Sequence, residues 1–249
     1  MSKIKVAELF YSIQGEGRYM GVPSIFLRTF GCNFTCAGFG MPKGTRSEEA
    51  DNIEEVAHMF TKYEDLPLVS TGCDSYASWH PDFKKLSPMM TTDAIVERIL
   101  DLIPDRNEKS AIARGFDGVH LVITGGEPLL GWQREYPELL TKLMAHGLKE
   151  VTFETNGTQE LTDDMWAFID TRPDLEITFS VSPKLSVSGE STDDAIKPEI
   201  VNRYRTAGYT YLKFVVASED DVLEARHATD LYRKAGFNGP VYLMAEGGT

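Results

Sequence analysis

Residues Val119–Pro128 read VHLVITGGEP, an almost unbroken apolar run that passes directly into two glycines, a glutamate and a proline. An apolar run of strand length without polar alternation is typical of a strand in a parallel sheet, where both faces are buried. The glycines permit a sharp turn, and the proline suits the first turn of a helix. The stretch therefore predicts a buried parallel strand, a polar turn and then a helix.

Similar strand and helix patterns alternate along the rest of the chain. Apolar runs predict six strands, at Ile25–Thr29, Val119–Ile123, Val151–Phe153, Ile177–Val181, Tyr211–Val216 and Val241–Met244. Amphipathic patterns predict helices at Thr92–Ile103, Tyr136–His146, Thr162–Ile169, Pro198–Ala207 and Glu219–Ala235. Because such alternation implies parallel strands joined by right-handed crossovers, we predict an α/β fold, an open or partial (β/α)6 barrel, in one domain over residues 1–249.

Polar and glycine-rich stretches follow almost every predicted strand. They are Gly31–Cys32, Thr124–Pro128, Glu154–Gly157, Ser180–Lys184 and Ala245–Gly247. Ligands of α/β proteins bind at the carboxyl ends of the strands, which all lie at one edge of a parallel sheet. The sequence therefore predicts a single site built from all five stretches.

The chain contains three cysteines, Cys32, Cys36 and Cys73, each close to turn-forming residues. An odd number of cysteines does not indicate a disulfide framework, and a shared metal centre is the favoured interpretation. Three thiolates on a four-iron cluster leave one iron free to bind a small molecule through its amine and carboxylate. The alternatives are a zinc site with His80 as a fourth ligand, and buried, unreactive thiols.

Composition limits the classes of partner. The net charge of −13 opposes contact with a phosphate backbone, so we expect no direct nucleic-acid partner. No apolar run reaches the length of a membrane span, and the start lacks the apolar core of a signal peptide. We therefore expect a cytoplasmic protein without a membrane partner.

Several motifs together resemble one enzyme family. They occur in the order of that family at Ser12–Gly17, Gly21–Pro23, Phe26–Arg28, Gly31–Asn33, Cys73–Ser75, Thr124–Leu129, Glu154–Thr158, Ser182–Lys184 and Lys213–Val216. The chain resembles the radical S-adenosylmethionine enzymes and, within them, the 7-carboxy-7-deazaguanine synthases, often called QueE. The stretch Ser12–Gly17 (SIQGEG) is the most discriminating, because the cysteine and Gly-Gly-Glu-Pro motifs belong to the whole superfamily.

The resemblance implies a partial barrel of the radical S-adenosylmethionine type and two cofactors. A 4Fe-4S cluster on Cys32, Cys36 and Cys73 would cleave S-adenosylmethionine reductively to a 5′-deoxyadenosyl radical, with flavodoxin or ferredoxin as electron donor. S-adenosylmethionine would be regenerated. Its implied binding residues are Gly72, Cys73, Asp74, Gly126, Glu127, Thr155, Asn156, Ser182, Pro183, Lys184, Met244, Ala245, Glu246 and Gly247.

The resemblance also implies a substrate, 6-carboxy-5,6,7,8-tetrahydropterin. Ring contraction with loss of ammonia would give 7-carboxy-7-deazaguanine, a carbon–nitrogen lyase reaction of queuosine and 7-deazaguanine biosynthesis. The implied substrate-binding residues are Ile13, Gln14, Gly15, Glu16, Arg28 and Thr124, with the planar fork of Arg28 suited to the carboxylate. The Ser75 hydroxyl would help to hold a Mg²⁺ ion at the substrate. A homodimer is the family expectation.

The chain departs from the family pattern at three places. Residues 37–72 form an insertion between the second and third cysteines, where the superfamily has two residues. Closing the longer loop costs about 2.6 kcal/mol more, a modest amount beside metal ligation, and Ile53, Val56, Ala57, Phe60 and Tyr63 predict an amphipathic helix within it. Ser75 stands where many relatives have threonine, and we expect the usual C-terminal tail to be missing.

Two other functions remain open at the level of sequence. An activating enzyme for a glycyl-radical protein shares the cysteine and Gly-Gly-Glu-Pro motifs, but it does not need the Gln14–Glu16 stretch or Arg28. A zinc-stabilised binding module without redox chemistry needs only the metal ligands.

Overall fold

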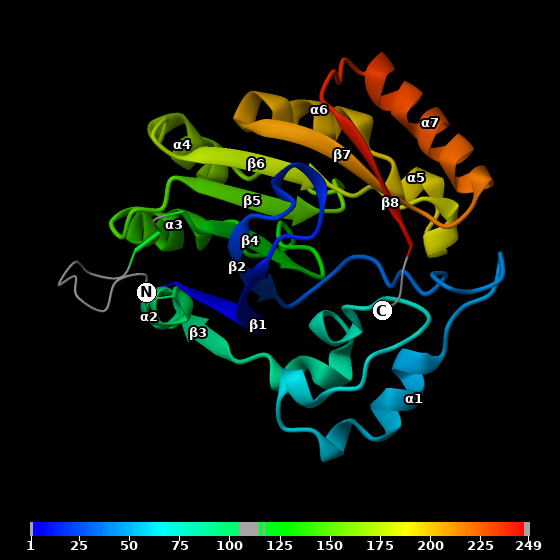
Figure 1. The fold of residues 1–249 in the computed structure, drawn as a ribbon, viewed down its shortest axis with the longest axis horizontal. Coiled ribbons are helices and arrows are strands. Elements are labelled where there is room, and N and C mark those ends of the chain that lie inside the picture. Colours follow the sequence, from blue (N-terminus) through cyan, green and yellow to red (C-terminus); the bar gives the residue numbers. More distant parts are fainter. Residues whose placement is uncertain (1, 105–114, 117, 247–249) are drawn as a thin grey trace.

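In the computed structural model, which describes residues 2–104, 115–116 and 118–246, eight strands form a single curved sheet (Figure 1). Their order across the sheet is β3-β1-β2-β4-β5-β6-β7-β8. The strands are β1 (Lys3–Ile13), β2 (Pro23–Thr29), β3 (Met89–Thr91), β4 (His120–Gly125), β5 (Glu150–Thr155), β6 (Glu176–Val181), β7 (Tyr209–Val216) and β8 (Val241–Ala245).

The six predicted strands correspond to β2 and β4–β8, which pair side by side in parallel. This arrangement confirms the predicted α/β fold, and because the sheet does not close on itself it is a partial barrel. The sequence patterns do not predict β1, which pairs antiparallel with β2, or the three-residue β3 at the edge. Both belong to the side of the sheet that is only partly buried, so their apolar patterns are weak.

Helices follow the parallel strands and lie along the outer side of the curved sheet (Figure 1). They are α2 (Thr92–Leu102), α3 (Tyr136–Met144), α4 (Asp163–Thr171), α5 (Thr192–Ala195), α6 (Pro198–Ala207) and α7 (Glu219–Lys234). All except the single-turn α5 correspond to a predicted helix. No helix of the described residues is both long enough and apolar enough to cross a membrane.

The two faces of the parallel strands differ in polarity. Leu121 and Ile123 on β4 and Phe153 on β5 belong to the main hydrophobic core beneath the helices. Thr124 on β4 and Thr152 on β5, which are next to these residues in the sequence, are buried polar residues. Since neighbouring residues of a strand point to opposite faces, the sheet presents a polar inner face at the carboxyl ends of its strands.

The insertion contains α1 (Glu49–Glu55) and the 3-10 helices η2 (Ala57–Met59) and η3 (Tyr63–Asp65). The prediction of one amphipathic helix that reaches Tyr63 is wrong, because α1 ends at Glu55 and the chain continues in short turns. These turns let Ala57 and its apolar neighbours pack into a second, smaller core with Tyr76 and Phe83. Those two residues belong to η4 (Tyr76–Ser78) and η5 (Pro81–Leu86), which follow Cys73.

Candidate active site at the carboxyl ends of the strands

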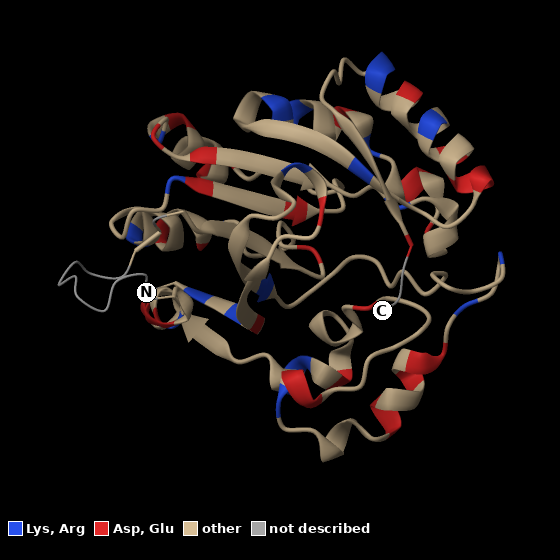
Figure 2. Cartoon of the chain, viewed as in Figure 1, with Lys and Arg blue, Asp and Glu red and all other residues tan. Residues whose placement is uncertain are grey.

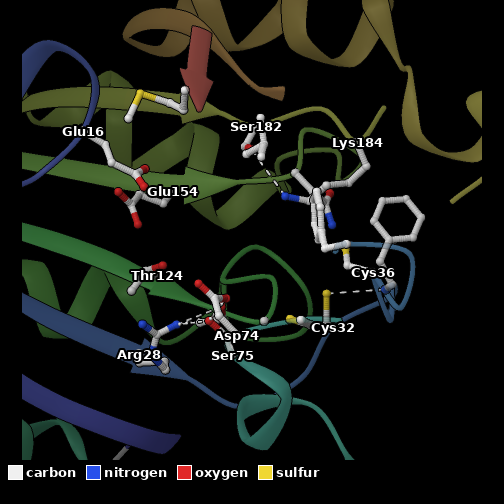
Figure 3. A pocket seen from close by; sticks show the side chains of 18 of the residues that line it. Glu16, Arg28, Cys32, Cys36, Asp74, Ser75, Thr124, Glu154, Ser182 and Lys184 are labelled. Atoms are coloured by element: carbon white, nitrogen blue, oxygen red, sulfur yellow. Dashed lines mark hydrogen bonds between the residues drawn. The ribbon is translucent and has the colours of Figure 1, made fainter. Parts of the chain in front are cut away.

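A cavity of about 480 Å³ lies at the carboxyl ends of the parallel strands (Figure 3). All five polar stretches that the sequence places after strands contribute to its wall. The predicted site residues that line it are Gln14, Gly15, Glu16, Arg28, Cys32, Cys36, Gly72, Cys73, Asp74, Ser75, Thr124, Gly126, Thr155, Asn156, Ser182, Lys184, Met244, Ala245 and Glu246. The structure therefore brings together residues from nearly the whole length of the chain.

Cys32 and Cys36 lie at one end of this cavity (Figure 3), Cys73 also lines the cavity, and none of the three is in a disulfide. Burial raises the pKa of the Cys32 thiol to about 12 and also raises the pKa values of Cys36 and Cys73. A metal centre binds thiolates. Its positive charge would stabilise the deprotonated form of these thiols, which burial disfavours at neutral pH.

At least one pair of the three sulfurs is too far apart for all three to bind a single ion as they are placed. Among the described residues, only Asp51, Glu54 and His80 form a group of three His, Cys, Asp or Glu ligand atoms that all lie within 4.8 Å of one another. Two sulfurs on one zinc ion, each at about 2.3 Å, cannot be more than about 4.6 Å apart. The cysteine sulfurs are therefore spread more widely than a mononuclear site requires.

The proposed fourth zinc ligand also lies elsewhere. His80 does not line the cavity, and its ring nitrogens face Asp51, Glu54 and Asp82 instead of the thiols. The alternative of a zinc site that combines the cysteines with His80 is therefore wrong.

A carboxylate holds the loop that carries Cys32 and Cys36. Oε1 of Glu190 accepts hydrogen bonds from the backbone N–H groups of Thr35 (2.9 Å) and Cys36 (2.7 Å). Cys36 has a φ angle of +48°, in the left-handed region that residues other than glycine rarely adopt. Glu190 thus stabilises a strained backbone at a candidate ligand, a contact that the sequence pattern gives no means to predict.

Gly126 brings two strand ends into close contact beside the cysteines. A Cβ atom at Gly126 would lie 2.4 Å from the Gly31 carbonyl oxygen and 2.7 Å from Cβ of Cys32. Only glycine fits at this position, and the close approach holds the turn after β4 against the loop that carries Cys32.

A chain of polar contacts connects the middle of the cavity with β1. Nη1 of Arg28 donates to the Ser75 hydroxyl (2.9 Å), Ser75 donates to Asp74 (3.0 Å), and Nε of Arg28 donates to Glu8 (3.3 Å). Burial acts to lower the pKa of Arg28, but the Tyr63 hydroxyl and the acidic groups around the guanidinium outweigh this effect and raise the pKa. Arg28 is therefore a charged group at the cavity wall, as its place in an apolar strand suggested.

Acidic and amide groups line the opposite end of the cavity from the cysteines (Figure 3). Nε2 of Gln14 donates to Glu154 (3.1 Å), and the Lys213 ammonium donates to Glu16. Burial acts to lower the pKa of Lys213, but Glu154 and Glu16 outweigh this effect and raise it. The sequence assigned neither Glu154 nor Lys213 a role in binding cofactor or substrate, although a lysine within the apolar run of β7 indicates a buried charge that needs a partner.

Four predicted site residues are not on the cavity wall. Ile13 is 63% exposed at the end of β1, and Pro183 is buried beside the cavity without lining it. Gly247 lies outside the described residues. The fourth is Glu127.

Glu127 is completely buried behind the wall. Its carboxylate accepts hydrogen bonds from the Thr155 hydroxyl (2.8 Å) and from the N–H groups of Asn156 (2.7 Å) and Leu129 (3.0 Å). Both oxygens of Glu127, which the resemblance implies as a cofactor-binding residue, thus already have internal partners. Glu127 holds Thr155 and Asn156 at the cavity.

No family model matches the chain. The chain is 29% identical over 242 residues to the 7-carboxy-7-deazaguanine synthase of Pyrobaculum aerophilum, a match that covers 97% of this chain and 79% of the relative. It is also 29% identical over 258 residues to the synthase of Halobacterium salinarum, covering 99% and 78% of the two chains.

The fold has a solved counterpart. The crystal structure of QueE from Escherichia coli matches with a TM-score of 0.54 and 20% identity, over 98% of this chain and 84% of that chain. This likeness confirms the fold. The sequence matches confirm the resemblance that the motifs indicate, and this chain is similar to 7-carboxy-7-deazaguanine synthases along nearly its whole length.

Proposed function

We propose that this chain, which is similar to the 7-carboxy-7-deazaguanine synthases, is itself such an enzyme. It would convert 6-carboxy-5,6,7,8-tetrahydropterin into 7-carboxy-7-deazaguanine with loss of ammonia, as a radical S-adenosylmethionine lyase. The observation that carries the proposal is a cavity lined by three thiols, one buried and two partly buried, and by Arg28, Glu16 and Glu154. One end suits a redox cofactor, and the other suits a polar heterocycle with a carboxylate.

Cys32, Cys36 and Cys73 would hold a 4Fe-4S cluster, for which the donor chemistry and the wide sulfur spacing are suitable. When bound, the cluster would supply the electron for reductive cleavage of S-adenosylmethionine. The wall between the cluster end and the substrate end would hold that cofactor, through Thr155, Asn156 and the residues around Ser182. The enclosure excludes water from a reactive radical.

Recognition of the substrate would use charge and hydrogen bonding. Arg28 presents a guanidinium that can bind the substrate carboxylate with two parallel hydrogen bonds once the contact with Ser75 is exchanged. The pterin edge offers N–H donors, and Glu16 and Glu154 offer acceptors beside the Lys213 ammonium. Thr124 lines the same end and adds a hydroxyl.

A Mg²⁺ ion would bind between these groups and the cysteines. The Ser75 hydroxyl and the Asp74 carboxylate lie within 3.0 Å of each other at the cavity wall. Both are hard oxygen ligands of the kind that Mg²⁺ prefers, and the remaining positions would be filled by water and substrate oxygens. The negative charge of Asp74 would offset the repulsion between the ion and Arg28.

The test is an anaerobic incubation of the cluster-loaded protein with S-adenosylmethionine, reductant, Mg²⁺ and the carboxytetrahydropterin. We expect 7-carboxy-7-deazaguanine and ammonia in equal amounts. Cleavage of S-adenosylmethionine without either product would reject the synthase and favour an activating enzyme for a glycyl-radical protein. Iron and sulfide analysis of the same sample, with about four of each per chain expected, tests the cluster separately.

A further inference from the structure

A second group of ligand-type side chains lies outside the cavity, where the insertion meets the segment after Cys73. Nε2 of His80 is 3.6 Å from Oδ1 of Asp51 and 3.6 Å from Oε2 of Glu54. On the other side of the ring, Nδ1 is 3.6 Å from Oδ2 of Asp82. Figure 2 shows the acidic residues gathered on α1, the helix that carries Asp51 and Glu54.

Two short elements create this arrangement. Asp51 and Glu54 are three residues apart on α1, so their side chains share one face of the helix. His80 is the N-cap residue of η5, and its Nδ1 accepts a hydrogen bond from the Asp82 N–H (3.5 Å). This position turns Nε2 towards α1; when Nε2 binds a cation, Nδ1 carries the ring proton, and Oδ2 of Asp82, 3.6 Å away, is placed to accept from it.

The imidazole is buried but does not hydrogen-bond to either carboxylate of α1. Its side chain is only 9% exposed and packs against Phe83 and Trp79. At 3.6 Å, both oxygens lie beyond the usual range for a hydrogen bond to Nε2. A buried ring nitrogen is thus aimed between two carboxylates without a close partner.

The acidic groups here also repel one another. A divalent cation among these groups would remove the repulsion and give Nε2 a partner.

We propose that Asp51, Glu54 and His80 form a binding site for a divalent transition-metal ion of the zinc type, separate from the cysteine cluster. Two ligand atoms at about 2.1 Å from one tetrahedral ion lie about 3.4 Å apart, so the observed 3.6 Å separations need little adjustment. An imidazole ligand favours Zn²⁺ over Mg²⁺. Asp51 and Glu54 are partly exposed, which leaves a position for water.

The bound metal ion would cross-link two segments of the chain. It joins α1 in the insertion to η5, just beyond the segment that carries Cys73 and Ser75. A metal at this position would fix the insertion against its small core and thereby restrain the loop of the third cysteine. This role does not depend on the proposed catalytic function.

The test is calorimetric titration of the full-length chain with Zn²⁺, in a background where Cys32, Cys36 and Cys73 are all serine. Zinc then has no thiolate to bind, and the result does not depend on the iron–sulfur cluster. We expect one equivalent to bind with micromolar affinity or tighter. His80→Asn keeps the acceptor of the N-cap but lacks Nε2, and Glu54→Gln removes a ligand charge; each should weaken binding by about tenfold or more. Glu55→Gln, on the same helix, is the matched control and should bind normally.

A thermal readout separates a metal site from a simple ion pair of His80. Zn²⁺ should raise the melting temperature of the background chain and of Glu55→Gln, but not of His80→Asn or Glu54→Gln. The proposal is overturned if no zinc binds in the micromolar range, or if both ligand variants bind as well as the background. A loss of stability in His80→Asn that is the same with and without Zn²⁺, together with no binding to the background, assigns the group to an ion pair.

Discussion

The guanidinium of Arg28 donates a hydrogen bond of 2.9 Å to the Ser75 hydroxyl, across 47 positions of sequence. Arg28 belongs to β2, and Ser75 belongs to the turn that follows the third cysteine. A carboxylate bound to Arg28 would therefore lie beside the hydroxyl that we propose as a metal ligand. This relationship would couple the proposed substrate binding and the proposed Mg²⁺ site to the position of the loop after Cys73.

Replacing Arg28 with lysine should weaken substrate binding. Lysine keeps the positive charge but cannot donate two parallel hydrogen bonds, and the loss of a charged hydrogen bond of about 1.5–3 kcal/mol corresponds to roughly a 10- to 100-fold weaker affinity. Titration of the cluster-loaded protein with the carboxytetrahydropterin measures the change. The iron content should remain unchanged, and an unaltered affinity would remove Arg28 from the carboxylate site.

Replacing Ser75 with alanine should abolish most of the stimulation by Mg²⁺, whereas Ser75→Thr should retain it. Both variants keep the backbone, but only threonine keeps a hydroxyl for a hard cation. The measurement is the rate of product formation as a function of Mg²⁺ concentration. If the alanine variant responds to Mg²⁺ as the unchanged protein does, Ser75 is not a ligand.

Replacing Glu190 with alanine should make the cluster easier to lose. The N–H groups of Thr35 and Cys36 lose their acceptor, and the left-handed conformation of Cys36 costs about 1–2 kcal/mol that those bonds no longer offset. We expect faster release of iron to a chelator under anaerobic conditions, followed by absorbance. The exposed Glu199→Ala is the control, and equal release rates in the two variants would contradict the role of Glu190.

His120 should make the protein less stable in acid. Its ring is buried on the inner face of β4, with Nε2 2.9 Å from the Thr152 hydroxyl. Burial lowers its pKa from 6.5 to about 4. Between these values the unfolded chain binds a proton that the folded chain does not, so folding stability falls as the pH drops, by at most about 3 kcal/mol.

Urea denaturation at pH 7 and at pH 4.5 tests this effect. In His120→Gln, which keeps a polar group near Thr152, the difference in unfolding free energy between the two pH values should shrink. Replacement of the exposed His227 by glutamine should leave the difference unchanged. An equal pH dependence in His120→Gln and the unchanged protein would show that another group is responsible.

The sequence by itself determined the parallel strands, most of the helices and the edge of the sheet that carries the cavity. These features depend on local properties: runs of apolar residues, helical periodicity, and glycines or prolines where the chain turns. The polar stretches that follow β2, β4, β5, β6 and β8 could be assigned to one edge because parallel strands place their carboxyl ends together. The motif order also indicated the family resemblance before any geometry was known.

Only the tertiary structure decided which side chains reach that cavity. Glu127 follows β4 and Glu154 lies near the end of the neighbouring β5, yet Glu127 turns into the protein to accept three hydrogen bonds and Glu154 lines the cavity with Lys213. The pairing of His80 with α1 likewise depends on how the insertion packs. Such outcomes follow from long-range packing and from the need to pair every buried charge, and neither is encoded in the neighbouring residues of the chain.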